Sequence, residues 1–241
     1  MDRMIYLSMS GAKATMQRQD TLANNLANVS TPGFRAELQA FRSVPVLGSG
    51  ASTRVYALET TPAYDASPGA ITATGRNLDV AMKANAWLAV QGLDGTEAYT
   101  RGGALDVAAD GTLTTRSGLT VLGDGGPIQT PANSEISIGS DGTVSARGIT
   151  GRSTVVGRLK LVTPEAPLQR GEDGLFRAEQ GDLPADATAR VQDGALEGSN
   201  VSAVETMVAM ISAARQFEAQ MKMLQTAEGD EKAAAQLLSL G

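Results

Sequence analysis

Side chains able to do chemistry are few in this chain. The sequence contains no cysteine and no histidine. It therefore has no thiol nucleophile and no disulfide, and it lacks the imidazole that is the commonest general base and zinc ligand. A catalytic site would have to use carboxylates, lysine or tyrosine. No Gly-x-Ser-x-Gly motif is present and no pair of carboxylates is indicated, so we predict no enzyme, no metal site and no cofactor.

Oxygen-rich and glycine-rich segments are the remaining candidates for binding a calcium ion or a dinucleotide. Asp-Gly-Thr occurs at 94–96, 110–112 and 141–143. A calcium loop needs several oxygen ligands at close, fixed spacing, whereas these tripeptides are isolated, so we interpret them as hairpin turns. The Gly-Asp-Gly-Gly-Pro segment at 123–127 lacks the order of a dinucleotide-binding loop, and no helical pattern follows it.

Net charge excludes some partners. The net charge is −6 and basic residues form no cluster, which argues against nucleic acid as a partner. No run approaches the roughly 20 apolar residues that span a bilayer, and the N-terminal segment lacks the apolar core of a signal peptide. We expect a protein that is not membrane-inserted, that binds no small-molecule substrate, and whose export needs no cleaved signal.

The elements that would position functional residues are clearest at the two ends of the chain. Residues 4–28 predict one helix and residues after 200 predict another, which Gly229 interrupts. Apolar positions recur with heptad spacing in both, which predicts helices that pack side by side. The two seams are Ile5, Met9, Ala12, Met16, Gln19, Ala23 and Leu26, and Ala203, Met207, Met210, Ala214, Phe217, Met221 and Leu224.

The centre of the chain has a different pattern. Short β-type runs separated by turns fill 76–198, and 44–75 is rich in Gly, Ser, Thr and Pro. We predict an α+β fold, in which the N- and C-terminal helices pair as a coiled-coil-like hairpin around a central all-β domain of short strands. The predicted domains are 1–35 plus 199–241 for helical assembly, 36–75 as an extended linker with a short helical turn at 35–43, and 76–198 as the β domain.

The N-terminal helix is unusually poor in charge. Between Met4 and Phe34 the only charged residues are Lys13, Arg18 and Asp20. Uncharged polar side chains can be buried when they are hydrogen-bonded, so this helix is expected to be surrounded in the working state. One two-helix seam offsets too little conformational entropy, so we expect the termini to order on assembly. The methionines of the seams suit either packing within the chain or an adaptable interface with other chains.

Several of these segments together resemble the axial proteins of the bacterial flagellum, the family of rod, hook and hook-associated subunits. The resemblance runs through essentially the whole chain. It is carried by Ala-Asn-Asn-Leu-Ala-Asn-Val-Ser-Thr-Pro-Gly-Phe at 23–34, by 75–81, by 196–201, and by Val204-Glu205 with 215–218. Within the family, 1–6 and the Trp-Leu-Ala-Val run at 87–90 resemble a proximal rod subunit. A distal rod or hook subunit is the alternative, and a carboxylate-based periplasmic wall hydrolase is a distant one.

This resemblance implies a structural subunit of the basal-body rod in the periplasm. It would self-assemble through its terminal helices into the helical drive shaft that transmits torque for motility. Its partners would be other proximal and distal rod proteins and the flagellar type III export apparatus, for which a chain without cysteine is suited. The residues expected to form the assembly interface lie at the N-terminal turn and in the closing helix: Asn24, Asn25, Leu26, Asn28, Pro32, Gly33 and Phe34, and Met207, Ile211, Phe217 and Leu224.

Overall fold

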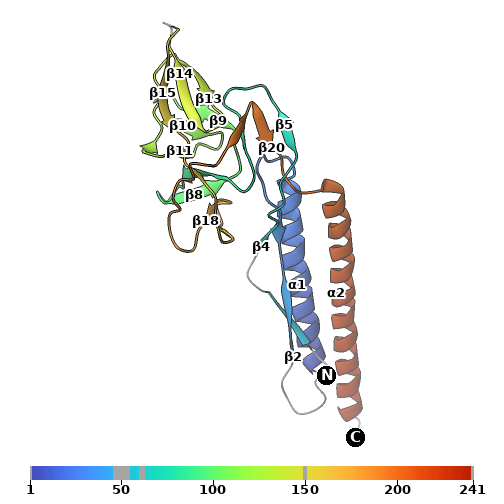
Figure 1. The fold of residues 1–241 in the computed structure, drawn as a ribbon. Coiled ribbons are helices and arrows are strands. Elements are labelled where there is room, and N and C mark those ends of the chain that lie inside the picture. Colours follow the sequence, from blue (N-terminus) through green and yellow to red (C-terminus); the bar gives the residue numbers. More distant parts are fainter. Residues whose placement is uncertain (1, 46–54, 60–62, 149–150, 240–241) are drawn as a thin grey trace. The chain divides into compact units, whose positions relative to one another are not determined.

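The computed structural model describes residues 2–45, 55–59, 63–148 and 151–239 (Figure 1). These residues form two compact units. Unit 1 contains the described parts of 1–29, 36–65 and 201–241, and unit 2 contains 30–35 and those of 66–200. The chain therefore passes between the units four times, at 29/30, 35/36, 65/66 and 200/201. The predicted α+β class is confirmed, since the described residues form two long terminal helices and many central strands.

Unit 1 is helical with two small β-pairs. Its helices lie side by side and antiparallel, with the N- and C-termini at the same end (Figure 1). The elements are α1 (Asp2–Ala27), α2 (Ala203–Ser239), β1 (Glu37–Leu38) paired with β4 (Ala63–Tyr64), and β2 (Phe41–Pro45) paired with β3 (Val55–Glu59).

Two local predictions in this unit are wrong. The helical turn expected at 35–43 is replaced by β1 and β2, because antiparallel partners elsewhere in the chain supply their hydrogen bonds and override a weak local propensity. Gly229 does not interrupt α2, which runs to Ser239. A single glycine costs a helix about 1 kcal/mol, which neighbouring turns can offset. Of the segment predicted as a linker, 46–54 and 60–62 lie outside the described residues.

The buried face of α1 differs from the predicted seam. Ser8, Ala12 and Thr15 are buried, whereas Met9 is 54% and Met16 58% exposed. The predicted seam is therefore wrong at both methionines. Small side chains are favoured on the inner face because the helices approach closely: a Cβ added to Gly11 would lie 3.0 Å from the Gln220 side-chain oxygen.

The buried face of α2 also differs from its predicted seam. Thr206, Ala213 and Ala227 are buried, while Met207 and Met221, two predicted seam residues, are 51% and 38% exposed. The Thr206 hydroxyl donates a hydrogen bond to the Ser202 carbonyl oxygen, just before the start of α2, at 2.8 Å. A small hydroxyl that is already hydrogen-bonded can be buried at low cost, so it can replace a methionine on the packed face.

Unit 2 is built from antiparallel strands. In its described part, one sheet contains nine strands, with the path β17-β18-β8-β7-β11-β10-β9, β12 on β11 and β16 on β7. The smaller groups are β13-β14-β15, β19-β6 and β20-β5. The strands are β5 (Ile71–Ala73), β6 (Val80–Met82), β7 (Trp87–Gln91), β8 (Glu97–Thr100), β9 (Leu105–Val107), β10 (Leu113–Thr115), β11 (Thr120–Gly123), β12 (Gly126–Pro127), β13 (Glu135–Ile138), β14 (Thr143–Arg147), β15 (Ser153–Arg158), β16 (Leu161–Val162), β17 (Gln169–Arg170), β18 (Phe176–Arg177), β19 (Val191–Asp193) and β20 (Ala195–Glu197).

The core of unit 2 lies around β7. Leu88 and Val90 are fully buried, and the Trp87 ring lies 4.7 Å from the Phe176 ring between centroids. Tyr99 is also buried, and most of the remaining core is aliphatic, with members on β6, β9, β10, β11, β14 and further strands. The run at 87–90 is apolar throughout because β7 has paired strands on both sides and is covered on both faces.

The three Asp-Gly-Thr segments form turns between consecutive strands, as predicted. Their aspartates, Asp94, Asp110 and Asp141, each accept a hydrogen bond from the backbone N–H of the threonine two residues later, at 2.9 to 3.0 Å. The threonine hydroxyls, and after them these backbone bonds, lower the pKa of Asp94 and Asp141. The backbone N–H of Thr112 is the main cause of the lowered pKa of Asp110. Their glycines have φ between +81° and +88°, a conformation that glycine adopts without strain.

Asp186 makes the stability of unit 2 depend on pH. Its carboxylate accepts hydrogen bonds from the Thr188 hydroxyl at 2.6 Å, the Thr163 hydroxyl at 2.7 Å and the Thr188 N–H at 2.8 Å. These bonds lower its pKa from 3.8 to about 2. Because the folded pKa is depressed, the stabilisation is present above pH 3.8 and is lost as the pH falls through 2.

We expect Asp186→Asn to make the acid dependence shallower. The melting temperature of unit 2 should fall less between pH 5 and pH 2 in the variant than in the wild type, as measured by circular dichroism. Thr163→Val removes one donor and keeps the carboxyl group, so it should flatten the same curve to a smaller extent. Parallel curves for all three proteins would contradict the role given to Asp186.

Candidate assembly interface

The C-terminal end of α1 holds β1 through Asn25. The Asn25 side-chain nitrogen donates to the Glu37 carbonyl oxygen at 3.0 Å, and its side-chain oxygen accepts from the Glu37 N–H at 2.8 Å. Asn25 is buried. The Asn25 amide thus pairs with the Glu37 backbone through one donor and one acceptor, as the backbone of a neighbouring strand would. Asn25 therefore acts within its own chain and fixes the path that follows the helix.

The other predicted residues of α1 have different surroundings. The Asn28 side-chain nitrogen donates to the Asn24 carbonyl oxygen at 2.9 Å and to its side-chain oxygen at 2.8 Å, which satisfies a carbonyl at the helix end. Asn24 is exposed and Leu26 is half-buried. Asn24 and Leu26 are therefore accessible to a neighbouring chain to different degrees, and Asn28 serves first as a cap.

The turn at Pro32, Gly33 and Phe34 is part of unit 2. Gly33 has φ +73° and donates its N–H to the Glu197 carbonyl oxygen at 2.8 Å. A Cβ at this position would lie 2.2 Å from the Arg101 carbonyl carbon, so only glycine fits. Phe34 is buried, and the Arg170 guanidinium lies 4.6 Å from its ring centroid. Arg170 also donates to the Arg35 carbonyl oxygen at 3.0 Å.

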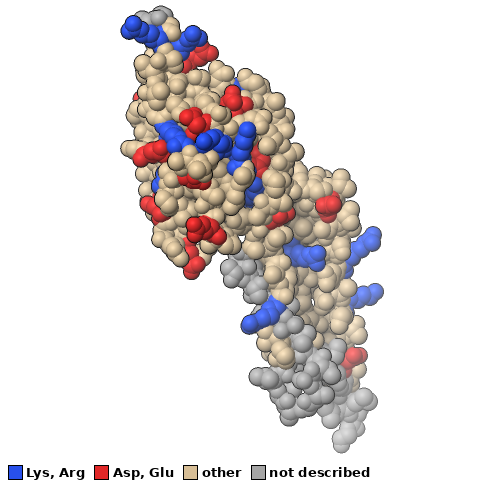
Figure 2. Space-filling view, in the orientation of Figure 1, with Lys and Arg blue, Asp and Glu red and all other residues tan. Residues whose placement is uncertain are grey.

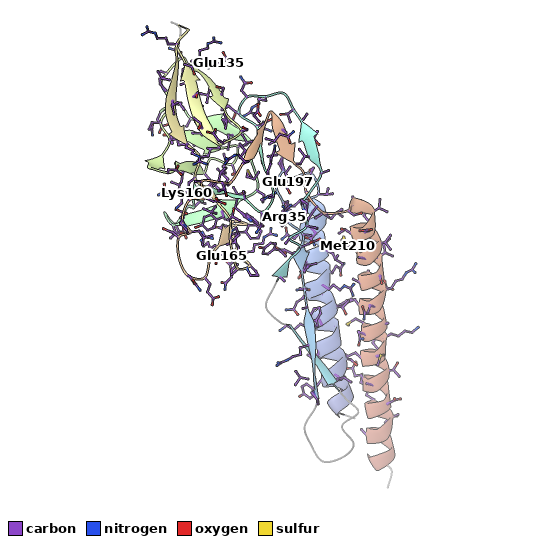
Figure 3. All side chains as sticks on the ribbon, in the orientation of Figure 1. Arg35, Glu135, Lys160, Glu165, Glu197 and Met210 are labelled. Atoms are coloured by element: carbon purple, nitrogen blue, oxygen red, sulfur yellow. The ribbon has the colours of Figure 1, made fainter. Side chains whose placement is uncertain are left out.

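Beside this turn lies a buried group of three charged residues, Arg35, Arg101 and Glu197, called here the Glu197 cluster. Arg35 and Glu197 are labelled in Figure 3. The side chains are between 1% and 3% exposed. Arg35 Nη1 lies 2.6 Å from Glu197 Oε1, and Arg101 Nη2 lies 2.6 Å from Glu197 Oε2. Two guanidinium groups thus share one carboxylate, and removing that carboxylate would leave two buried positive charges.

Arg101 is further held by backbone oxygens. It donates to the Met82 carbonyl oxygen at 3.1 Å and the Ala84 carbonyl oxygen at 2.9 Å. Burial lowers the pKa of the Arg101 guanidinium, while the carboxylate of Glu197 opposes the shift. The carbonyl oxygens help to compensate the second positive charge of the cluster.

The four predicted residues of α2 divide into two kinds. Phe217 and Leu224 are half-buried, and each lies about one helical turn from a buried alanine, Ala213 and Ala227 respectively. Met207 and Ile211 are 51% and 56% exposed. The first pair faces the interior of unit 1, and the second pair faces outward.

Outward-facing apolar side chains recur along both helices. The α1 outer stripe consists of Tyr6, Met9 and Met16, which are 56%, 54% and 58% exposed. The α2 outer stripe consists of Val204, Met207, Val208 and Ile211, which are 72%, 51%, 61% and 56% exposed. Spacings of three, four and seven residues place the members of each stripe on one helix face. Apolar area of this extent on a surface is typical of a protein–protein contact.

Charged side chains of both signs lie on the surface. On the face in Figure 2, acidic and basic side chains are intermingled over unit 2, and the helices show mainly uncharged surface with a few basic and acidic side chains. Across the described ranges, no group of three or more acidic residues is placed to hold a metal ion. Neither α1 nor α2, within its described residues, is long and apolar enough to cross a membrane.

Sequence reasoning missed the Glu197 cluster. Glu197 lies in the segment 196–201 on which the resemblance rests, but its role depends on Arg35 and Arg101, which are 162 and 96 residues away. The local signal was a charged residue directly after the apolar pair Ala195-Leu196 in a β-type run, because a glutamate is rarely fully buried unless it is paired.

Comparisons with known proteins agree along the chain. Three family models match: flagella basal body rod protein over residues 5–35, the flagellar hook protein FlgE/F/G D1 domain over 81–146, and the flagellar basal body rod FlgEFG protein C-terminal region over 192–237. The flagellar basal-body rod protein FlgF of Salmonella typhimurium is 47% identical over 100% of both chains, and FlgF of Escherichia coli is equally similar. FlgG of Bacillus subtilis is 31% identical over 94% of this chain and 95% of its own.

These matches define a subunit of the flagellar rod and hook class. The chain belongs to the FlgF family of flagellar basal-body rod proteins, since the Salmonella and Escherichia coli members are 47% identical to it and the FlgG relative is 31% identical. The resemblance stated from the sequence is thereby confirmed. The protein is a structural subunit of the rod, located in the flagellar basal body, and it assembles with other rod components.

Proposed function

We propose that this subunit builds the proximal rod through its terminal helices. The two helices pair as a coiled-coil-like hairpin in each subunit, and the outer stripes bind the helices of neighbouring subunits. Contacts that join different surfaces of successive copies do not close on themselves and therefore generate a helical assembly. Many parallel contacts of this kind would carry torque along the drive shaft.

The observation that supports this proposal is the exposure of the two outer stripes. Met9, Met16, Met207 and Ile211 are more than half exposed in the single chain, although each is large and apolar. Methionine adapts to irregular partners, which suits a subunit that meets both its own copies and other rod proteins. The functional division into assembly domain 1–35 plus 199–241, arm 36–75 and β domain 76–198 is part of this proposal.

The proposal extends to export and to folding. We infer that the chain passes unfolded through the type III export apparatus into the periplasm without a cleaved signal, and that it works without catalysis. The terminal helices order when they are surrounded by other subunits, because the burial that stabilises them is then completed. A distal rod or hook role is the alternative, but the FlgF relatives at 47% identity favour the proximal rod.

Limited proteolysis of the dilute purified protein tests this function, with the fragments identified by mass spectrometry. We expect rapid cleavage up to about residue 29 and from about residue 201, leaving a stable fragment that contains unit 2. The same sites should be protected in isolated basal bodies. Equal resistance of free and assembled helices would show that the termini fold without neighbours, and would overturn the proposal of ordering on assembly.

A further inference from the structure

All four chain crossings between the units are bounded, within unit 2, by three short segments that meet at Glu197. The segment 30–35 bounds two crossings, 66–70 bounds the third and 197–200 bounds the fourth. These segments are distant in sequence, yet all of them are hydrogen-bonded in one place. Any force that acts on unit 2 in an assembled rod reaches the terminal helices of the same subunit through the covalent chain at these crossings.

Glu197 contacts both of the other segments. Its carbonyl oxygen accepts from the Gly33 N–H at 2.8 Å. Its Oε1 accepts from the Gly69 N–H at 2.9 Å and lies 2.6 Å from Arg35 Nη1. Its Oε2 lies 2.6 Å from Nη2 of Arg101, the residue that directly follows β8 of the main sheet. One side chain therefore joins every crossing segment to the rigid part of unit 2.

Backbone contacts around Glu197 reinforce the same junction. The Gly198 N–H donates to the Ala70 carbonyl oxygen at 2.8 Å, and the Asn200 side-chain nitrogen donates to the Ser67 carbonyl oxygen at 3.0 Å. A Cβ at Gly69 would lie 2.0 Å from the Gly198 carbonyl oxygen. The segments thus approach backbone to backbone, which leaves them no room to move independently.

We propose that the Glu197 cluster is a positioning device that clamps the four crossings together, so that load on unit 2 enters both terminal helices at once. This inference rests on the proposed function, because it concerns how an assembling subunit transmits force. A cluster serving stability alone could lie anywhere in the core. The ion pair of Lys160 and Glu97, at 2.7 Å and also largely buried in unit 2, is the matched control. Within the described part of the chain, the polar side-chain partners of Glu97 are Lys160 and Tyr99, which lie outside the crossing segments.

Amide hydrogen exchange of the purified full-length protein tests the clamp. In Glu197→Gln, the amides of Gly33, Gly69 and Gly198 should exchange about 10- to 100-fold faster relative to the core amides of Leu105 and Leu113, because charge-assisted hydrogen bonds to the crossings are weakened. Glu97→Gln should accelerate crossing and core amides by the same factor. Uniform acceleration in Glu197→Gln, or selective acceleration in Glu97→Gln, would overturn the clamp.

A second variant covers the case in which Glu197→Gln does not fold. Arg35→Met leaves one carboxylate with one guanidinium, a neutral pair, and keeps much of the side-chain volume. It should show the same selective acceleration at Gly33 with the core amides unchanged, and unchanged exchange at Gly33 would overturn the clamp. Because exchange is measured on the free subunit, failure of the clamp is distinguishable from failure of assembly through the helices.

The load dependence of swimming provides the functional test. Cells carrying Arg35→Met should build rods and swim at wild-type speed in dilute medium, and should lose speed more steeply than Glu97→Gln cells as the viscosity rises. Identical speed–viscosity curves for Arg35→Met and Glu97→Gln cells would overturn the role in force transmission.

Discussion

Replacing Gly33 with alanine is expected to destabilise unit 2 by about 2–5 kcal/mol, because two separate costs add. Gly33 has φ +73°, where a side chain costs about 1–2 kcal/mol. Its Cβ would also meet the Arg101 carbonyl carbon and the Gly102 nitrogen at 2.2 Å. Backbone atoms cannot rotate away as a side chain does, so the turn must shift and weaken its hydrogen bond to the Glu197 carbonyl oxygen.

The measurement is thermal unfolding of the purified variant, followed through the β-sheet signal of unit 2. A loss of 2–5 kcal/mol corresponds to a decrease of about 5–15 °C in melting temperature for a unit of this size. Gly75→Ala is the matched control, because Gly75 has φ +70° and a Cβ there meets nothing within 4 Å. Gly75→Ala should lose only the roughly 1–2 kcal/mol of stability that a side chain costs at positive φ. Equal losses in the two variants would contradict the close approach described for Gly33.

Local chemistry explains which elements could be predicted from the sequence. The helix predicted at 4–28 is observed as α1, Asp2–Ala27, and the Asp-Gly turns lie between strands as expected. These features depend on residues close in sequence: periodic apolar positions, Asp and Gly in turns, and proline after a helix. These features could be predicted without knowing which distant parts of the chain come together in the fold.

The helix faces and the Glu197 cluster depend on distant residues. Ser8 and Thr15 are buried in place of Met9 and Met16, because Gly11 allows α2 to approach closely. A pattern based on hydrophobicity assigns the methionines to the inside and misses this approach. Glu197 likewise contacts the segments that bound the crossings only because the folded chain brings three distant segments together. A local sequence pattern does not encode this meeting.

The offset of the helix faces has a functional consequence. If the methionines had filled the inner seam, each subunit would have buried its own apolar surface. The small residues of the inner face leave the larger side chains of the outer stripes exposed instead. A pair of helices arranged in this way has apolar area available for neighbours, which connects the packing within one subunit to the proposed assembly of many.

Ile211→Asp should therefore abolish rod assembly while leaving unit 2 folded. Ile211 is 56% exposed in the chain, so the change removes little packing within the subunit. In an assembled rod the same position would place a carboxylate in an apolar contact, at a cost of several kcal/mol in every subunit. Cells carrying the variant should be non-motile in soft agar and should lack complete basal bodies in electron micrographs, whereas the purified variant should show wild-type melting of unit 2.

Gln216→Asp is the control for this experiment. Gln216 is also exposed, and the substitution adds the same charge to α2 about 140° around the helix from Ile211 and outside the α2 outer stripe. It should retain most of the wild-type motility. Motile Ile211→Asp cells would exclude the α2 outer stripe from the rod contact, and equal loss in both variants would show that any added charge on α2 is harmful. Loss confined to Ile211→Asp would assign the contact to the outer face of the helix, where the exposed side chains are, and not to the seam that its heptads predict.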